Sequence, residues 1–114
     1  MLRTLVIMAL LLRSMWANEA IVEEVKVTKD KGMYNFSVRI LHEDSGWEHY
    51  VNRYEILNEK GHLLATRILV HPHENEQPFT RTLNGVVMKD LKKVYVRAHD
   101  SVDGYSKLYE VTLP

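Results

Sequence analysis

The feature that most constrains this fold is a two-residue alternation of apolar and polar side chains, which recurs along the chain after residue 20. It is clearest in residues 33–41, whose apolar face carries Tyr34, Phe36, Val38 and Ile40. Successive side chains of a β-strand point to opposite faces of a sheet, so this pattern predicts strands with one buried face. No segment after residue 20 keeps the 3.6-residue period of an amphipathic helix.

Turn-forming residues separate the alternating segments and indicate the fold class. The predicted strands cover residues 21–27, 33–41, 50–57, 62–70, 79–83, 93–99 and 107–113. Turns with glycine are predicted at residues 29–32, 58–61, 84–85 and 103–104. Short strands at this regular spacing predict an all-β fold, an immunoglobulin-like antiparallel β-sandwich of about seven strands.

The first 17 residues, MLRTLVIMALLLRSMWA, have the parts of a secretory signal peptide. Arg3 supplies the positive charge, residues 5–12 form an apolar run, and Ala17 is a small residue suited to cleavage. The run is too short to cross a bilayer as a helix. We therefore expect residues 1–17 to be a signal peptide and residues 18–114 a periplasmic or secreted domain without a membrane span. An uncleaved N-terminal anchor is the alternative.

Composition excludes several classes of function. The chain has 15 basic and 15 acidic residues and no basic stripe, which argues against a nucleic-acid partner. It contains no cysteine, so disulfide scaffolds, thiolate zinc sites, iron–sulfur clusters and cysteine nucleophiles are excluded. There is no glycine-rich phosphate loop, and no serine, histidine and acid are spaced as a hydrolytic triad.

The histidines are expected to gather at one end of the sandwich. Consecutive antiparallel strands reverse direction, so loops 42–49, 71–78 and 99–107 should share an end. Five of the six histidines map to these loops: His42, His49, His71, His73 and His99. Imidazoles with nearby carboxylates are typical ligands of Zn, Cu, Ni and non-haem Fe. These five histidines are therefore predicted as ligands of a divalent transition metal.

The tightest local pattern among them is His71-Pro72-His73. In extended backbone, residues two apart point to the same side, and Pro72 disfavours a helical conformation at His71. Asp100 and Asp103 are expected to accept hydrogen bonds from ring N–H groups and orient them.

One segment resembles a known family. Residues 42–57, HEDSGWEHYVNRYEIL, are similar to the signature of superoxide reductases (desulfoferrodoxin/neelaredoxin), in which a His-Pro pair precedes a His-Tyr-Ile sequence. The segments IVEEVKV and MYNFSVRIL resemble the first two strands of that family. The resemblance implies an immunoglobulin-like sandwich that holds iron at one end through four histidines and a cysteine. His42 and His49 match two of those histidines.

The departures from the family pattern change the expected chemistry. Glu43 stands where the family has proline, and the two histidines are one residue further apart. No histidine lies near residues 18–21, and the closing cysteine and histidine are missing. The resemblance therefore implies the scaffold without the thiolate on which superoxide reduction depends.

A fainter resemblance, at Leu69-Val70-His71-Pro72 and Gln77-Pro78-Phe79, is to the sandwich subunit of the periplasmic sulfur-oxidation carrier complex, which supports a protein partner. The leading interpretation is an exported binding or accessory module whose histidine-rich end takes a divalent metal. Alternatives are a metal-free interaction sandwich, which would use that end or an edge strand for a protein partner, and a redox enzyme on the reductase-like scaffold. Trp47 is the candidate exposed aromatic contact.

Overall fold

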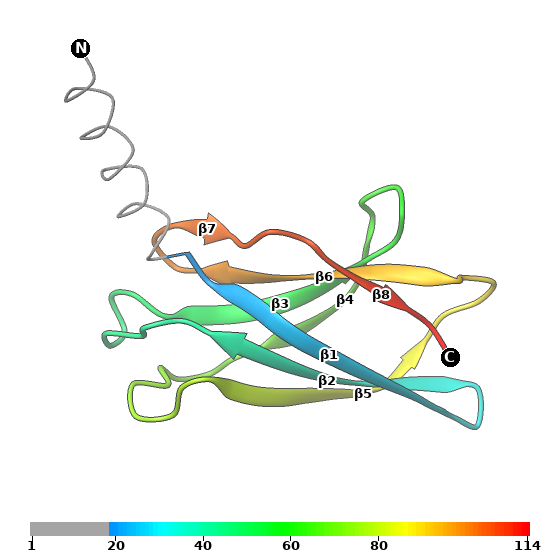
Figure 1. Cartoon of the computed structure of the whole chain (residues 1–114), viewed down its shortest axis with the longest axis horizontal. Coiled ribbons are helices and arrows are strands. Elements are labelled where there is room, and N and C mark those ends of the chain that lie inside the picture. Colours follow the sequence, from blue (N-terminus) through cyan, green and yellow to red (C-terminus); the bar gives the residue numbers. More distant parts are fainter. Residues whose placement is uncertain (1–18) are drawn as a thin grey trace, which may run out of the picture.

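The computed structural model describes residues 19–114, and the predicted signal peptide of residues 1–17 lies outside them. The described chain is all-β, as predicted (Figure 1). Its strands are β1 (Ile21–Asp30), β2 (Met33–Leu41), β3 (Val51–Leu57), β4 (Leu63–Ile68), β5 (Phe79–Val87), β6 (Lys93–Asp100), β7 (Gly104–Tyr105) and β8 (Tyr109–Thr112).

Two antiparallel sheets form the sandwich. One has the strand order β1-β2-β5, and the other has the order β4-β3-β6-β7 with β8 also paired to β6. One end of β6 pairs with β7 through His99 and Asp100, whereas β8 pairs with the other end, from Lys93 to Val96. The antiparallel sandwich predicted from the alternation is confirmed. The count is eight rather than about seven, because the predicted turn at 103–104 opens into the two-residue strand β7.

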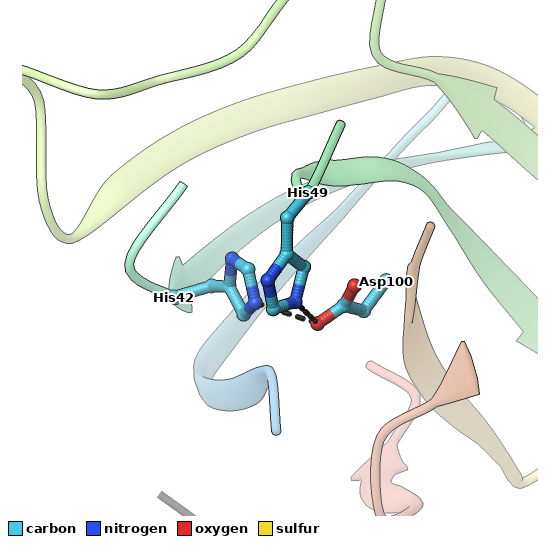
Figure 2. A group of neighbouring side chains, drawn as sticks. All are labelled: His42, His49 and Asp100. Atoms are coloured by element: carbon cyan, nitrogen blue, oxygen red, sulfur yellow. Dashed lines mark hydrogen bonds and ion pairs between the residues drawn. The ribbon is translucent and has the colours of Figure 1, made fainter. Parts of the chain in front are cut away.

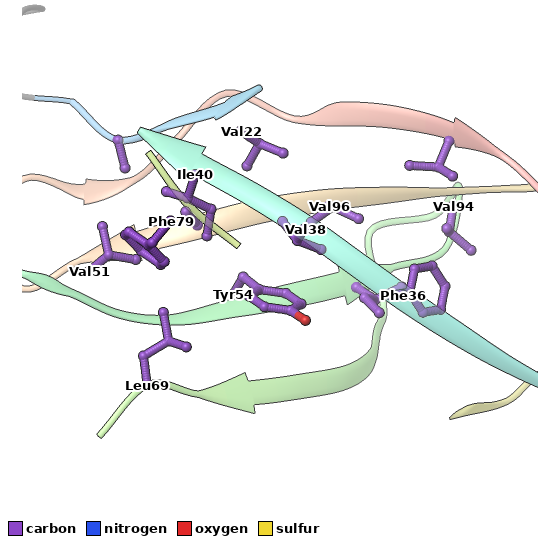
Figure 3. Packing of buried hydrophobic residues seen from close by; sticks show 14 of the residues in the cluster. Val22, Phe36, Val38, Ile40, Val51, Tyr54, Leu69, Phe79, Val94 and Val96 are labelled. Carbon is purple, nitrogen blue, oxygen red and sulfur yellow. The ribbon is translucent and has the colours of Figure 1, made fainter. Parts of the chain in front are cut away.

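The core lies between the sheets and is filled by the alternating apolar side chains (Figure 3). Phe36, Tyr54 and Phe79 are the largest side chains that are almost completely buried. Burying an aromatic side chain of this kind contributes about 1.5–3 kcal/mol relative to its exposure. The Tyr54 hydroxyl donates a 3.0 Å hydrogen bond to the carbonyl of Arg81, which links the two sheets. The strands that carry the functional loops are therefore anchored in a rigid interior.

The predicted turn at Asn84-Gly85 is wrong, because β5 continues through these residues to Val87. The register between β2 and β5 shifts by one residue there, with Tyr34 opposite Val86 and Phe36 opposite Leu83. Gly85 has a positive φ of 73°, and its N–H donates a 2.9 Å hydrogen bond to Oδ1 of Asn35. The Asn-Gly signal thus marks a β-bulge with glycine in the left-handed region.

The predicted grouping of the loops is confirmed. Figure 1 shows the β2–β3, β4–β5 and β6–β7 connections together at the left end of the molecule. We call residues 42–50, 69–78 and 99–105 the histidine-rich end. Its three connections are tied to one another by direct contacts, including those of His42 with Asp100 and of Asp44 with His73. Within residues 19–114, no helix has the length and apolar character needed to span a membrane.

Candidate metal centre

His42 lies at the centre of the histidine-rich end because it continues the inward-facing side of β2. Tyr34, Phe36, Val38 and Ile40 point into the core, and the next residue of that series is His42. Its side chain is only 1% exposed. A buried imidazole needs partners for both ring nitrogens. Nδ1 lies 2.6 Å from Oδ1 of Asp44, and Nε2 lies 2.6 Å from Oδ2 of Asp100.

Asp100 and His49 complete the cluster with His42 (Figure 2). Asp100 is the last residue of β6, is 1% exposed, and lies on the inward face after Val94, Val96 and Ala98. Its Oδ2 also contacts Nε2 of His49 at 2.8 Å. Its Oδ1 accepts hydrogen bonds from the N–H groups of Val102, at 2.8 Å, and Asp103, at 3.3 Å.

Asp44 holds the β2–β3 loop and the β4–β5 loop around His42. Its side chain is completely buried. Besides the contact with His42, Oδ1 accepts a 3.2 Å bond from the N–H of Val51, and Oδ2 accepts a 2.7 Å bond from the N–H of His73. Gln77 adds a second link, because it accepts from the N–H of His42 and donates to the carbonyl of His73, both at 2.9 Å.

The carboxylates set the protonation preferences of the cluster. Burial by itself lowers the pKa of His49, but the hydrogen bond to Asp100 and the charges of Asp100 and Asp103 outweigh it and raise that pKa above its ordinary value. Burial opposes ionisation of Asp100, yet the Val102 N–H and the two histidines lower its pKa. The structure therefore favours an ionised Asp100 beside His49.

The donor atoms are suited to a divalent metal. One ligand atom each from His42, His49 and Asp100 lies within 4.8 Å of the others. Two imidazoles and one carboxylate suit Zn, Cu, Ni and non-haem Fe. With bonds of about 2.0–2.1 Å, neighbouring tetrahedral ligands stand roughly 3.3 Å apart, so the two nitrogens must move away from Asp100 Oδ2 by about 0.5–0.7 Å to admit an ion. Iron held by four histidines and a thiolate does not fit a chain without cysteine.

Asp103 lies beside this group. Its Oδ2 is 3.2 Å from Nε2 of His49, and its side chain is 38% exposed. Asp103 thus adds a second, partly exposed carboxylate beside His49, outside the group of His42, His49 and Asp100.

His71 and His73 lie on the neighbouring β4–β5 loop, outside this cluster. Their ring centroids are 4.9 Å apart, and the His73 ring stacks on Phe79 at 4.1 Å. Burial and the positive charges of Arg81 and His71 lower the pKa of His73. Nδ1 of His73 is buried without a hydrogen-bond partner, with Asp44 Oδ2 at 3.7 Å. The structure does not bring these two imidazoles together with His42 and His49.

His99 faces away from the cluster, on the outer side of the five-stranded sheet. Its Nδ1 lies 2.9 Å from Oδ1 of Asn52 and 3.2 Å from a guanidinium nitrogen of Arg53. Its ring contacts Tyr105 edge-on at 4.8 Å. Side chains alternate along β6, so His99 and its inward-facing neighbour Asp100 point to opposite faces.

Sequence reasoning missed the part played by Asp44 and assigned Asp100 only an orienting part. The available signal was strand parity: residue 42 extends the buried face of β2, and residue 100 extends the buried face of β6. The position of Asp44 depends on the path of the β2–β3 loop, which alternation does not specify. Trp47 is 66% exposed, as predicted.

Sequence comparison finds a similarity over part of the chain. No protein-family model matches the chain. A protein described as "Putative lipoprotein" from Halomicrobium mukohataei is 36% identical over 70 residues, which cover 61% of this chain and 34% of the relative. The chain thus spans about a third of the length of this curated relative.

Two solved structures share the architecture. The hypothetical protein PH1083 from Pyrococcus horikoshii OT3 aligns with a TM-score of 0.55 and 17% identity, over 84% of this chain and 90% of that one. A superoxide reductase in the oxidized state aligns with a TM-score of 0.56 and 18% identity, over 87% of this chain and 92% of the other. The protein therefore has a superoxide-reductase-like β-sandwich fold, as the resemblance implied. At these identities the likeness defines the fold alone.

Proposed function

We propose that this protein is an exported or envelope-bound binding module that holds a divalent metal through His42, His49 and Asp100. The observation that carries the proposal is the convergence of three ligand atoms within 4.8 Å at the end of a rigid sandwich. The 36% identity to a protein described as a lipoprotein supports an envelope location, as does the signal-like sequence of residues 1–17.

Hydrogen bonds from neighbouring groups orient the proposed ligands for metal binding. If Nδ1–H of His42 donates to Asp44, Nε2 is the nitrogen left to bind a metal, which would replace the proton between Nε2 and Asp100. Oδ1 of Asp100 accepts a hydrogen bond from the N–H of Asp103 in the following turn. This bond positions the Asp103 carboxylate beside His49. A metal bound here would supply a Lewis-acid centre that also joins the β2–β3 loop to the β6–β7 hairpin.

Calorimetric titration of the chelator-treated full chain with Zn(II), Cu(II), Ni(II) and, without oxygen, Fe(II) tests the proposal. We expect stoichiometric binding of at least one of these ions. His49→Ala should weaken that binding by tenfold or more, because it removes a ligand from the entrance of the site. His62→Ala is the matched control, since His62 is an exposed histidine outside the histidine-rich end.

The ligand set predicted from sequence gave prominence to His71 and His73, and a double His71→Ala/His73→Ala variant separates the two assignments. Retained binding supports the cluster of His42, His49 and Asp100. Loss of binding in the double variant together with full retention in His49→Ala would overturn that cluster and favour the His71–His73 pair.

The alternative, a redox enzyme, predicts a different measurement. An iron-loaded chain that consumes superoxide would favour it over the binding module. The chain holds no cysteine to supply a thiolate, and exposed acidic side chains surround the centre. Negative charge of this kind repels an anionic substrate such as superoxide.

A further inference from the structure

A second feature of the histidine-rich end is an open groove beside the metal centre, with a volume of about 420 Å³. Its lining includes Trp47, His71, His73, Glu74 and Arg81. The indole of Trp47 is 66% exposed and is held edge-on against Tyr50, with ring centroids 5.6 Å apart. Tryptophan is enriched at protein interfaces, where its ring supplies a large apolar contact and its N–H a polar one.

The charge around the groove is strongly one-sided. Exposed carboxylates rim the histidine-rich end: Glu43, Glu48, Glu74, Glu76 and Asp103. Segments 40–52, 68–80 and 98–106 contain no lysine or arginine. Arg81, at the edge of the groove, is paired with Glu76 at 2.8 Å. Arg53 and Arg97, which contact Tyr105 at this end, are both paired with Glu55. The charge left unpaired around the groove is therefore negative, and it attracts cations and repels anions.

His73 adds a specific hydrogen-bonding requirement. Its side chain is 3% exposed and forms part of the groove lining, and its Nδ1 has no hydrogen-bond partner. The nearby carboxylate of Asp44, 3.7 Å from Nδ1, favours the tautomer with its proton on Nδ1. Nε2 is then the acceptor of the ring. A ligand that satisfies it must donate a hydrogen bond.

We propose that this groove is a docking site for a segment of a partner protein that carries lysine or arginine. An ammonium or guanidinium group suits both the indole face of Trp47 and the carboxylate of Glu74, and it is a donor, as an imidazole acceptor at His73 requires. The apolar stem of such a side chain can pack on Pro72, which also lines the groove. This inference does not depend on metal binding.

The test is an NMR titration of the full chain with two capped pentapeptides, Gly-Lys-Leu-Arg-Gly and its counterpart with glutamate at both charged positions. The indole N–H signal of Trp47 is identified by its loss in Trp47→Phe. We expect the basic peptide to shift this signal and the acidic peptide to leave it unchanged. Raising the salt from about 0.05 M to about 0.5 M should weaken the binding, because exposed charges are screened.

Three variants measure the contributions. Glu74→Gln should weaken binding about two- to fivefold, as expected for one exposed charge pair. Trp47→Ala should weaken it roughly tenfold, because the cation loses its aromatic face. Glu59→Gln removes another exposed carboxylate, outside the histidine-rich end on the β3–β4 turn, and should have no effect.

Other outcomes would overturn the proposal. Equal shifts with both peptides, or no shift with either, exclude recognition of cationic side chains. Salt-sensitive self-association in sedimentation would make a second copy of this chain the occupant instead. In His49→Ala, retained peptide binding with lost metal binding supports two separate sites, whereas joint loss shows that the groove is not a site of its own.

Discussion

Two pairs of histidines lie at the same end of this protein and differ in how the structure holds them. His42 and His49 are seven positions apart in the sequence, yet their Nε2 atoms meet at one oxygen of Asp100. His71 and His73 are nearly adjacent, but within residues 19–114 no carboxylate is hydrogen-bonded to either ring, and Asp44 Oδ2 lies 3.7 Å from Nδ1 of His73. Close spacing along the chain therefore does not tell which imidazoles share a buried carboxylate.

The physical reason is the cost of burial. An imidazole in the interior requires hydrogen bonds to both nitrogens, and the carboxylates that satisfy His42 are themselves buried and fully bonded. Such a network holds its atoms in place before any ligand arrives. The His71 ring is exposed and has weaker contacts, a 3.3 Å hydrogen bond to the carbonyl of Pro72 and a tilted contact with the His73 ring.

The largest expected effect is the loss of stability on substituting Asp44, which is hydrogen-bonded to His42 of the first pair. Asp44→Ala leaves His42 Nδ1 and the N–H groups of Val51 and His73 without their acceptor. We expect the free energy of unfolding to fall by about 3–5 kcal/mol, the range for breaking a buried ionic network. Urea denaturation of the metal-free chain measures this loss. Glu43→Ala, which removes the exposed neighbouring carboxylate, should change stability by less than about 0.5 kcal/mol.

The next effect concerns metal affinity. Asp100→Asn keeps the shape of the side chain but removes the charge that faces both histidines, so we expect affinity to fall roughly 10- to 100-fold. Glu74→Gln, beside the second pair, should leave it within about twofold. Calorimetric titration of both variants makes the comparison. If Glu74→Gln causes the larger loss, the metal belongs to the His71–His73 loop.

Much of this arrangement could be predicted from alternation alone. The period-two pattern gives the strands, the reversal of consecutive strands places the three loops at one end, and strand parity marks residues 42 and 100 as buried. Parity does not give the path of a loop, so Asp44 could not be assigned as the shared acceptor. The Asn84-Gly85 sequence misled for a related reason, because the same positive φ suits a hairpin turn and a β-bulge.

The two pairs should also respond to pH with opposite signs. The pKa of His49 is raised by its carboxylates against the effect of burial, and the pKa of His73 is lowered by burial and by Arg81. In the metal-free chain, His49 therefore adds stability below pH 6.5 that is lost as the pH rises through its folded pKa. The folded chain binds a proton at His73 less readily than the unfolded chain does. His73 therefore lowers the stability of the fold as the pH falls below 6.5.

Proton NMR of the imidazole C2–H signals checks this contrast directly. His49→Gln and His73→Gln assign the two signals by their loss. We expect the midpoint of His49 to lie above 6.5 and that of His73 below it. Coincident midpoints would show that the carboxylates around the first pair do not hold a proton there.

The smallest expected effect is that of His99→Gln. His99 was a predicted ligand, but it pairs in register with Arg53 and Tyr105 on the outer face of the sheet. Glutamine can still bond to Asn52 and Arg53, so we expect metal affinity within about twofold of the original chain and a stability loss under about 1 kcal/mol. Calorimetry and urea denaturation measure the two quantities. A larger loss of metal affinity would mean that the Arg53–Tyr105 contacts hold the turn with Asp100 and Asp103 in place, which would extend the preorganised region from the buried cluster to the outer face of the sheet.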